Sequence, residues 1–190
     1  MTDEHLSALI EAMIVTEEKH SVCRSIQYDH PKMNNFDPDL TCGALIKFLT
    51  SQFKKDRKKS PIKFFTFDFN TEGAKIEKAN DILKFIFENA KKWDKLTQFY
   101  FYGGDITKSI SKEVVEEWFA MQKNLVKIEF KNCGMTLPYL KAILNGFIQS
   151  IKRRGENNLK YKIIIELDET ANTSVFYNDK FREFVTNFLR

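Results

Sequence analysis

Apolar residues along the chain follow two different spacings, and segments with the two spacings take turns. Where apolar and polar residues alternate we predict strands, which cover 62–69, 96–102, 125–130 and 161–167, with a shorter one near Ile26. Where apolar residues recur every three or four positions we predict helices, at 6–14, 45–53, 79–93, 114–119, 136–151 and 181–189. This order predicts βα units and a parallel sheet within a single domain.

Three of the predicted strands share one internal spacing of apolar residues. The segments that begin at Ile62, Leu96 and Leu125 each carry apolar residues at their first, fourth and sixth positions. Their starts, at 62, 96 and 125, lie 34 and 29 residues apart, which is typical of repeat architectures. The third copy continues to Cys133 and Met135, so that the whole segment is LxxIxFxxCxM.

This pattern resembles the long, ribonuclease-inhibitor-like leucine-rich repeats, in which LxxLxLxxN/CxL is followed by a helix. The resemblance covers about residues 62–135, with Phe or Ile in place of most Leu, and it implies that Cys133 is buried. The looser strands at both ends are what capping units would show. The Phe-rich strands and basic helices are also similar, more weakly, to the FTH-type regions that follow F-boxes. The Leu-Pro opening of an F-box is absent near the N-terminus, so a ubiquitin-ligase role would lack its main motif.

The polarity of the strands decides between two α/β folds. Strands covered on both faces are continuously apolar, whereas here Lys127, Glu129 and Lys131 share one face, and Thr66 and Asp68 lie opposite neighbouring phenylalanines. We therefore expect a short βα-repeat solenoid of about five parallel strands with helices on one face. The alternative is a doubly wound, three-layer sheet.

We expect one domain over residues 1–190. An N-terminal capping helix and the first βα unit would occupy 1–61, the leucine-rich-repeat-like units 62–135, and a C-terminal βα unit with a closing helix 136–190.

Composition indicates which residues fill the core and in which compartment the protein is expected. Of the 18 phenylalanines, six are expected to point inward from strands, and Phe64 is expected on the open face. The chain has an odd number of cysteines, three, and an acidic start, which argue against a disulfide framework and a signal peptide. Because no apolar run approaches ~20 residues, we expect no membrane association and a cytoplasmic or nuclear location.

Candidate chemistry is sparse. Of the three histidines, only His20 lies near a cysteine, Cys23, and a tetrahedral metal site needs three or four ligands. Gly103-Gly104-Asp105 lies between a strand and a helix, where a phosphate loop would lie, but the spacing of phosphate-binding motifs is missing. We expect a permissive turn there, and no enzyme, metal, cofactor or small-molecule substrate.

Basic residues cluster at the predicted helix C-termini, where they complement the helix dipole. In a βα solenoid these ends share one edge, so the clusters would form a basic edge that can steer an acidic protein or a nucleic-acid backbone. Its candidates are Lys54, Lys55, Arg57, Lys58, Lys59, Lys91, Lys92, Lys95, Lys152, Arg153 and Arg154. Acidic residues would gather near the opposite edge, so that the net charge of +4 conceals a dipole: Asp68, Glu72, Asp105, Glu113 and Asp168.

The open strand face supplies the candidate partner-binding residues. Aromatic side chains flanked by charges are typical of an interface core and its rim, although another segment of the chain could cover them. The candidates are Phe64, Thr66, Gln98, Tyr100, Tyr102, Lys127, Glu129 and Lys131, with Lys162 beside them. We expect a non-catalytic protein–protein interaction module or adaptor. Two alternatives stay open: nucleic-acid binding through the basic edge, and an enzyme on a doubly wound sheet.

Overall fold

A computed structural model describes residues 25–29, 38–54, 62–69, 78–89, 91, 93–154 and 162–165, and residues 5, 8, 9 and 12. The strands are β1 (Ser25–Asp29), β2 (Phe64–Asp68), β3 (Gln98–Tyr102), β4 (Lys127–Lys131) and β5 (Lys162–Ile165). The helices are α2 (Pro38–Lys54), α3 (Ala79–Glu88), α4 (Ile106–Ser109), α5 (Lys112–Met121) and α6 (Leu137–Arg154). The predicted helices at 6–14 and 181–189 lie wholly or mostly outside these residues.

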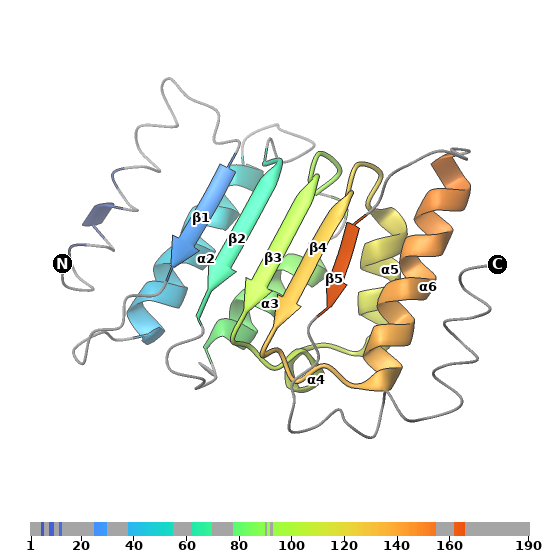
Figure 1. Ribbon diagram of the computed structural model, residues 1–190. Helices are drawn as coiled ribbons and strands as arrows, with labels where there is room; N and C mark the ends of the chain where they lie inside the picture. The colour runs from blue at the N-terminus through green and yellow to red at the C-terminus, as the bar shows by residue number, and fades with distance from the viewer. Residues whose placement is uncertain are drawn as a thin grey trace.

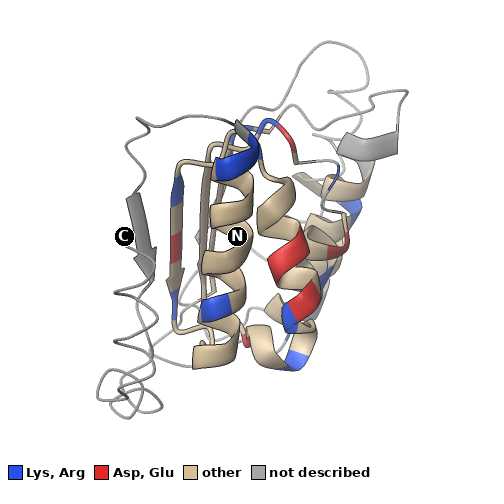
Figure 2. Ribbon diagram, turned by 90° about the vertical axis from the view of Figure 1, so that its right-hand side faces the viewer, with Lys and Arg blue, Asp and Glu red and all other residues tan. Residues whose placement is uncertain are grey.

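The strands pair in chain order, β1-β2-β3-β4-β5, and every pair is parallel. The labelled helices lie together behind the sheet in Figure 1, and Figure 2, which shows the sheet edge-on, places them to one side of it. The α/β class is therefore confirmed. A doubly wound sheet reverses its strand order at a switch point, and the described strands show no such reversal.

Phenylalanine fills the layer between sheet and helices. The six inward phenylalanines of the strands are fully buried, as predicted: Phe65, Phe67, Phe69, Phe99, Phe101 and Phe130. Their rings lie side by side across the strands, with centroids 5.5 Å apart for Phe65 and Phe99 and 6.3 Å apart for Phe67 and Phe101. Such aromatic contacts add to the stabilisation from buried area. The phenylalanine excess therefore describes mainly a core.

The backbone hydrogen bonds repeat from one strand to the next. The carbonyl of Lys63 accepts from the amides of Thr97 and Gln98 at 2.8 and 3.1 Å, and the carbonyl of Thr97 accepts from Val126 and Lys127 at 2.9 and 3.1 Å. The strands β3 and β4 thus enter the sheet by the same connection to the preceding strand.

Three details of the predicted elements are wrong. The helix expected to reach Trp93 ends at Glu88, because Asn89 caps it: its side-chain amide donates to the carbonyl of Phe85 at 2.7 Å. Trp93 is nevertheless buried, and its indole donates to the carbonyl of Ile86 at 3.1 Å. The helix predicted over 45–53 begins earlier, at Pro38 of α2, a position that suits the fixed φ of proline. The short helix α4 was not expected, whereas the predicted helix containing Pro138 in its first turn is present as α6.

Candidate binding surface

The face of the sheet that is turned away from the helices carries the predicted binding residues in three rows. The pairing register aligns Phe64, Gln98 and Lys127 in the first row, at the start of the strands. Thr66, Tyr100 and Glu129 form the second row, and Asp68, Tyr102 and Lys131 form the third. The strands β2, β3 and β4 that carry them run side by side facing the viewer in Figure 1, so the structure brings all eight predicted residues together. Lys162 pairs with Lys127, but its side chain lies outside the described part.

Exposure on this face is uneven. Phe64 is 40% exposed, whereas the other predicted residues are half-buried. The ammonium of Lys127 lies 4.7 Å from the centre of the Tyr100 ring, and that of Lys131 lies 5.5 Å from the centre of the Tyr102 ring. These cation–π contacts keep both tyrosines in place on the face.

A linked set of charges spans the second and third rows. Lys131 Nζ lies 3.0 Å from Glu129 Oε1, and the Glu129 side chain is 13% exposed. The pKa of Tyr102 is raised well above its usual value, mainly by burial and then by the negative charge of Glu129 and the hydrogen bond to it. The charge of Asp68 contributes to the same rise. Tyr102 therefore stays protonated at neutral pH and donates its hydroxyl proton to Glu129, which fixes this end of the face.

The first and second rows meet at Tyr100. Its hydroxyl donates to Gln98 Oε1 at 2.7 Å. A hydrogen bond with the same hydroxyl is the main cause that raises the pKa of Lys127. Lys127 is therefore cationic throughout the physiological range, and its ammonium is held over an aromatic ring where a partner can reach it.

The described part of the predicted basic edge lies at the start of the strands. Lys91, Lys95, Lys152 and Arg153 are exposed there, and Arg153 Nη1 also donates to the carbonyl of Ala120 near the end of α5 at 3.4 Å. Lys54 and Arg154 end α2 and α6, with only their backbone described, and the remaining candidates lie outside the described residues: Lys55, Arg57, Lys58, Lys59 and Lys92. Sequence reasoning missed Lys63 and Lys123, exposed residues just before β2 and β4, because neither belongs to a run of basic residues.

The opposite edge is not purely acidic, contrary to the expectation. Asp105 and Glu113 lie near it, but Lys108 Nζ is 3.9 Å from Asp105 Oδ2, and Lys112 Nζ is 3.9 Å from Glu113 Oε1. Figure 2 shows basic residues at both ends of the helices. Glu72 and Asp168 lie outside the described residues. The dipole predicted from the sequence is therefore weakened, because lysines in the first turns of α4 and α5 offset the carboxylates.

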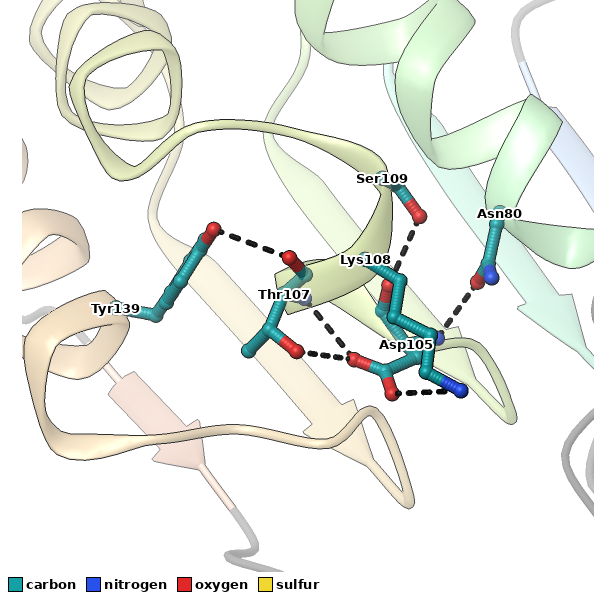
Figure 3. A network of polar contacts seen from close by, with 6 residues as sticks. All are labelled: Asn80, Asp105, Thr107, Lys108, Ser109 and Tyr139. Carbon is teal, nitrogen blue, oxygen red and sulfur yellow. Dashed lines mark hydrogen bonds and ion pairs between the residues drawn. The ribbon is translucent and has the colours of Figure 1, made fainter.

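The predicted turn at Gly103-Gly104-Asp105 is occupied by its own side chains (Figure 3). Gly103 has φ +84°, which glycine adopts without strain. Asp105 Oδ1 accepts from the amide and hydroxyl of Thr107 at 3.0 and 2.6 Å, and the Asp105 amide donates to Asn80 Oδ1 at 2.7 Å. The Asp105 carboxylate thus caps the start of α4.

Metal ligands and cysteines of the described part of the chain can be surveyed directly. No group of three or more His, Cys, Asp or Glu residues that could hold a metal is found there, and His5 is its one histidine. Cys42 and Cys133 are both buried, as expected for Cys133. None of the described helices is long and apolar enough to cross a membrane.

A hollow of about 460 Å³ on the helix side was not predicted. It lies between α3 and α5 and is lined by Phe87, Glu88, Asn89, Lys91, Val114, Glu117, Trp118 and Met121. The sequence carried no signal for it, because its walls belong to two helices whose separation depends on how they pack on the sheet.

Comparison with known proteins gives no relative. No protein-family model matches the chain, and no curated protein and no solved structure matches it significantly. The function must therefore be inferred from the residues and their geometry.

Proposed function

We propose that the chain is a short βα-repeat solenoid that acts as a protein–protein interaction module or adaptor through its open strand face. The observation that carries this proposal is the set of three aligned rows on β2, β3 and β4. They place an exposed phenylalanine beside two tyrosines and a rim of charges on the face opposite the described helices. Aromatic residues ringed by polar groups are the usual energetic centre of a protein interface.

Two features support the solenoid. The connection from each strand to its predecessor recurs at Lys63 and Thr97, as expected if 62–135 consists of repeated units. Cys133, at the N/C position of the repeat, places Sγ 3.3 Å from the carbonyl oxygen of Phe101 in the preceding unit. A side chain at that position that donates to the neighbouring unit would tie successive repeats together.

Nucleic-acid binding through the basic edge is the second candidate. It is favoured by the exposed Lys63, Lys95 and Lys123 in successive strand-entry segments. A single strand would also need aromatic faces on which to stack, and the rings of Tyr100 and Tyr102 already carry lysine ammonium groups. Binding of a labelled oligonucleotide that falls steeply between about 50 and 200 mM salt would support this candidate. No binding at low salt would exclude it.

The enzyme hypothesis depended on a site at the switch point of a doubly wound sheet. The described strands follow one another in chain order, so this part of the sheet offers no such point. A cytoplasmic or nuclear location stays a prediction.

The experiment is capture of partners from cells with the full chain and two matched variants. The double variant Tyr100→Ala/Lys127→Ala alters the open face, and Lys84→Ala/Glu117→Ala alters exposed residues of α3 and α5 on the helix side. We expect a protein that the wild type and the helix-side variant retain and the face variant loses, while thermal unfolding shows that all three chains are folded. A partner retained equally by all three chains would show that the face is not the site.

A further inference from the structure

The first row of the open face adjoins the basic edge, and together they form what we call the strand-start corner. It consists of Phe64, Gln98 and Lys127 in register, with Lys63, Lys95 and Lys123 in the segments that lead into β2, β3 and β4. Because parallel strands all start at the same edge of the sheet, these segments lie along one border. Phe64 lies within that border, beside the exposed Ser25 of β1.

Positive charge dominates this corner. Lys63, Lys95 and Lys123 are exposed, and Lys127 projects over the Tyr100 ring. The nearest carboxylate on the face, Glu129, lies one row further along and is paired with Lys131 at 3.0 Å. In the adjoining turn, Asp94 is half-buried, and its carbonyl accepts from Asn124. An exposed aromatic ring is thus bordered by several ammonium groups.

We propose that the partner of the open face is an acidic protein segment. One apolar side chain of that segment packs on Phe64, and its carboxylates pair with Lys127 and Lys63. This inference rests on the proposed function and adds the chemistry of the partner. Phe64 and Lys127 lie two strands apart, so the apolar and acidic groups of the segment are about 10 Å apart, from a strand spacing of ~4.8 Å. An acidic segment would also be steered to this border by its field.

The same cations could attract a nucleic-acid backbone, but the aromatic groups favour a protein. Two of the three aromatic side chains on the face are covered by lysines, and their rings are not free for bases. The exposed Phe64 ring fits an aliphatic or aromatic side chain of a protein segment.

The test is a selection of peptides from a random phage-displayed library on the full chain, followed by fluorescence polarisation with a synthetic copy of a selected peptide. We expect selected peptides that combine Asp or Glu with a large apolar residue. Their affinity should fall at least about tenfold for Lys127→Glu and for Phe64→Ser, which corresponds to ~1.4 kcal/mol. Lys127→Gln should give a smaller loss, and Lys112→Glu, which reverses an exposed lysine on the opposite edge, should bind within about twofold of wild type.

The outcomes separate this inference from the proposed function. If the selected peptides lack acidic residues but bind Tyr100→Ala more weakly than wild type, the acidic partner would be overturned and the open face would remain the site. Peptides that ignore every face variant, or a selection that enriches nothing, would overturn both. A labelled 20-nucleotide oligouridine that binds with the same dependence on Phe64 and Lys127 would replace the protein segment with a nucleic acid. Thermal unfolding of each variant checks that it is folded.

Discussion

Replacing Gly146 with alanine separates tertiary packing from helix propensity. Gly146 lies inside α6 where this helix crosses α5. A Cβ atom there would overlap the carbonyl oxygen of Glu116 and lie 2.8 Å from the Phe119 Cβ and 3.1 Å from the Ala120 amide nitrogen. Gly43 inside α2 is the matched control, since a Cβ atom there meets nothing within 4 Å. The same substitution is thus made in two helices that differ in what surrounds the added methyl group.

The two substitutions are expected to change the free energy of unfolding in opposite directions. Helix propensity alone stabilises a glycine-to-alanine change by about 1 kcal/mol, and we expect that gain for Gly43→Ala. At Gly146 the obstacle is backbone, which cannot turn aside as a side chain can. The two helices must therefore separate, and overpacking of this kind costs about 1–3 kcal/mol or more. Because the obstacle is backbone, the cost should lie in the upper part of this range, at about 2–3 kcal/mol, which leaves Gly146→Ala destabilised by about 1–2 kcal/mol after the propensity gain is deducted.

The assay is urea unfolding followed by tryptophan fluorescence, because Trp93 and Trp118 are both buried in the core. We expect a lower midpoint for Gly146→Ala and a higher one for Gly43→Ala, with equal slopes. If Gly146→Ala were as stable as the wild type or more stable, the close crossing of α5 and α6 would be wrong, and with it the packing of the helix layer.

Four further predictions concern three single groups, Tyr102, Cys133 and Trp93. Burial and Glu129 raise the pKa of Tyr102 above its ordinary value of 10.0. In a pH titration, tyrosine absorbance at 295 nm should therefore show one ionisation at higher pH than the others, and Glu129→Gln should move it to lower pH. If this ionisation did not move, the contact between Tyr102 and Glu129 would be wrong. The same raised pKa means that the unfolded chain loses this proton first, so the free energy of unfolding should decline as pH rises above about 10, and a free energy that stays level there would count against it. Cys133→Ala should cost about 1–2 kcal/mol in urea unfolding, and the Cys133 thiol should react with a thiol reagent only on unfolding; fast labelling of the native chain would refute its burial. Trp93→Phe, which leaves the carbonyl of Ile86 with one indole donor fewer, should lower the stability by about 1 kcal/mol, and a neutral result would show that the second indole suffices.

Alternation of polarity was enough to predict the strands and their inward residues. Phe65, Phe67 and Phe99 are buried as expected because a strand with one wet face must alternate strictly, and a shift by one residue would expose all of them. The shared spacing of the segments that start at 62, 96 and 125 also predicted the register, because the residues two positions after each start, 64, 98 and 127, pair with one another. Local pattern sufficed here because the sheet joins strands that are consecutive along the chain.

Helix ends and charges were harder to predict. Trp93 continues the apolar period of α3, yet the helix ends at Glu88, since Asn89 supplies a competing cap that periodicity does not record. Similarly, the acidic residues near the ends of the strands predicted an acidic edge. These acidic residues pair with Lys108 and Lys112, which lie in the first turns of α4 and α5. The helix α4 is too short to show a helical spacing of apolar residues in the sequence. Such features follow from side-chain contacts that a one-dimensional pattern omits.

The central claim is that the open strand face binds a protein. The most direct test of this claim is titration calorimetry with the captured partner. It compares the dissociation constant for the wild-type chain with that for Tyr100→Ala/Lys127→Ala. We predict a rise of about 30-fold or more, as expected when an interface centre worth ~2 kcal/mol is removed, while thermal unfolding shows that the variant is folded. A dissociation constant within about twofold of wild type, or an equal loss in the helix-side variant Lys84→Ala/Glu117→Ala, would contradict the claim.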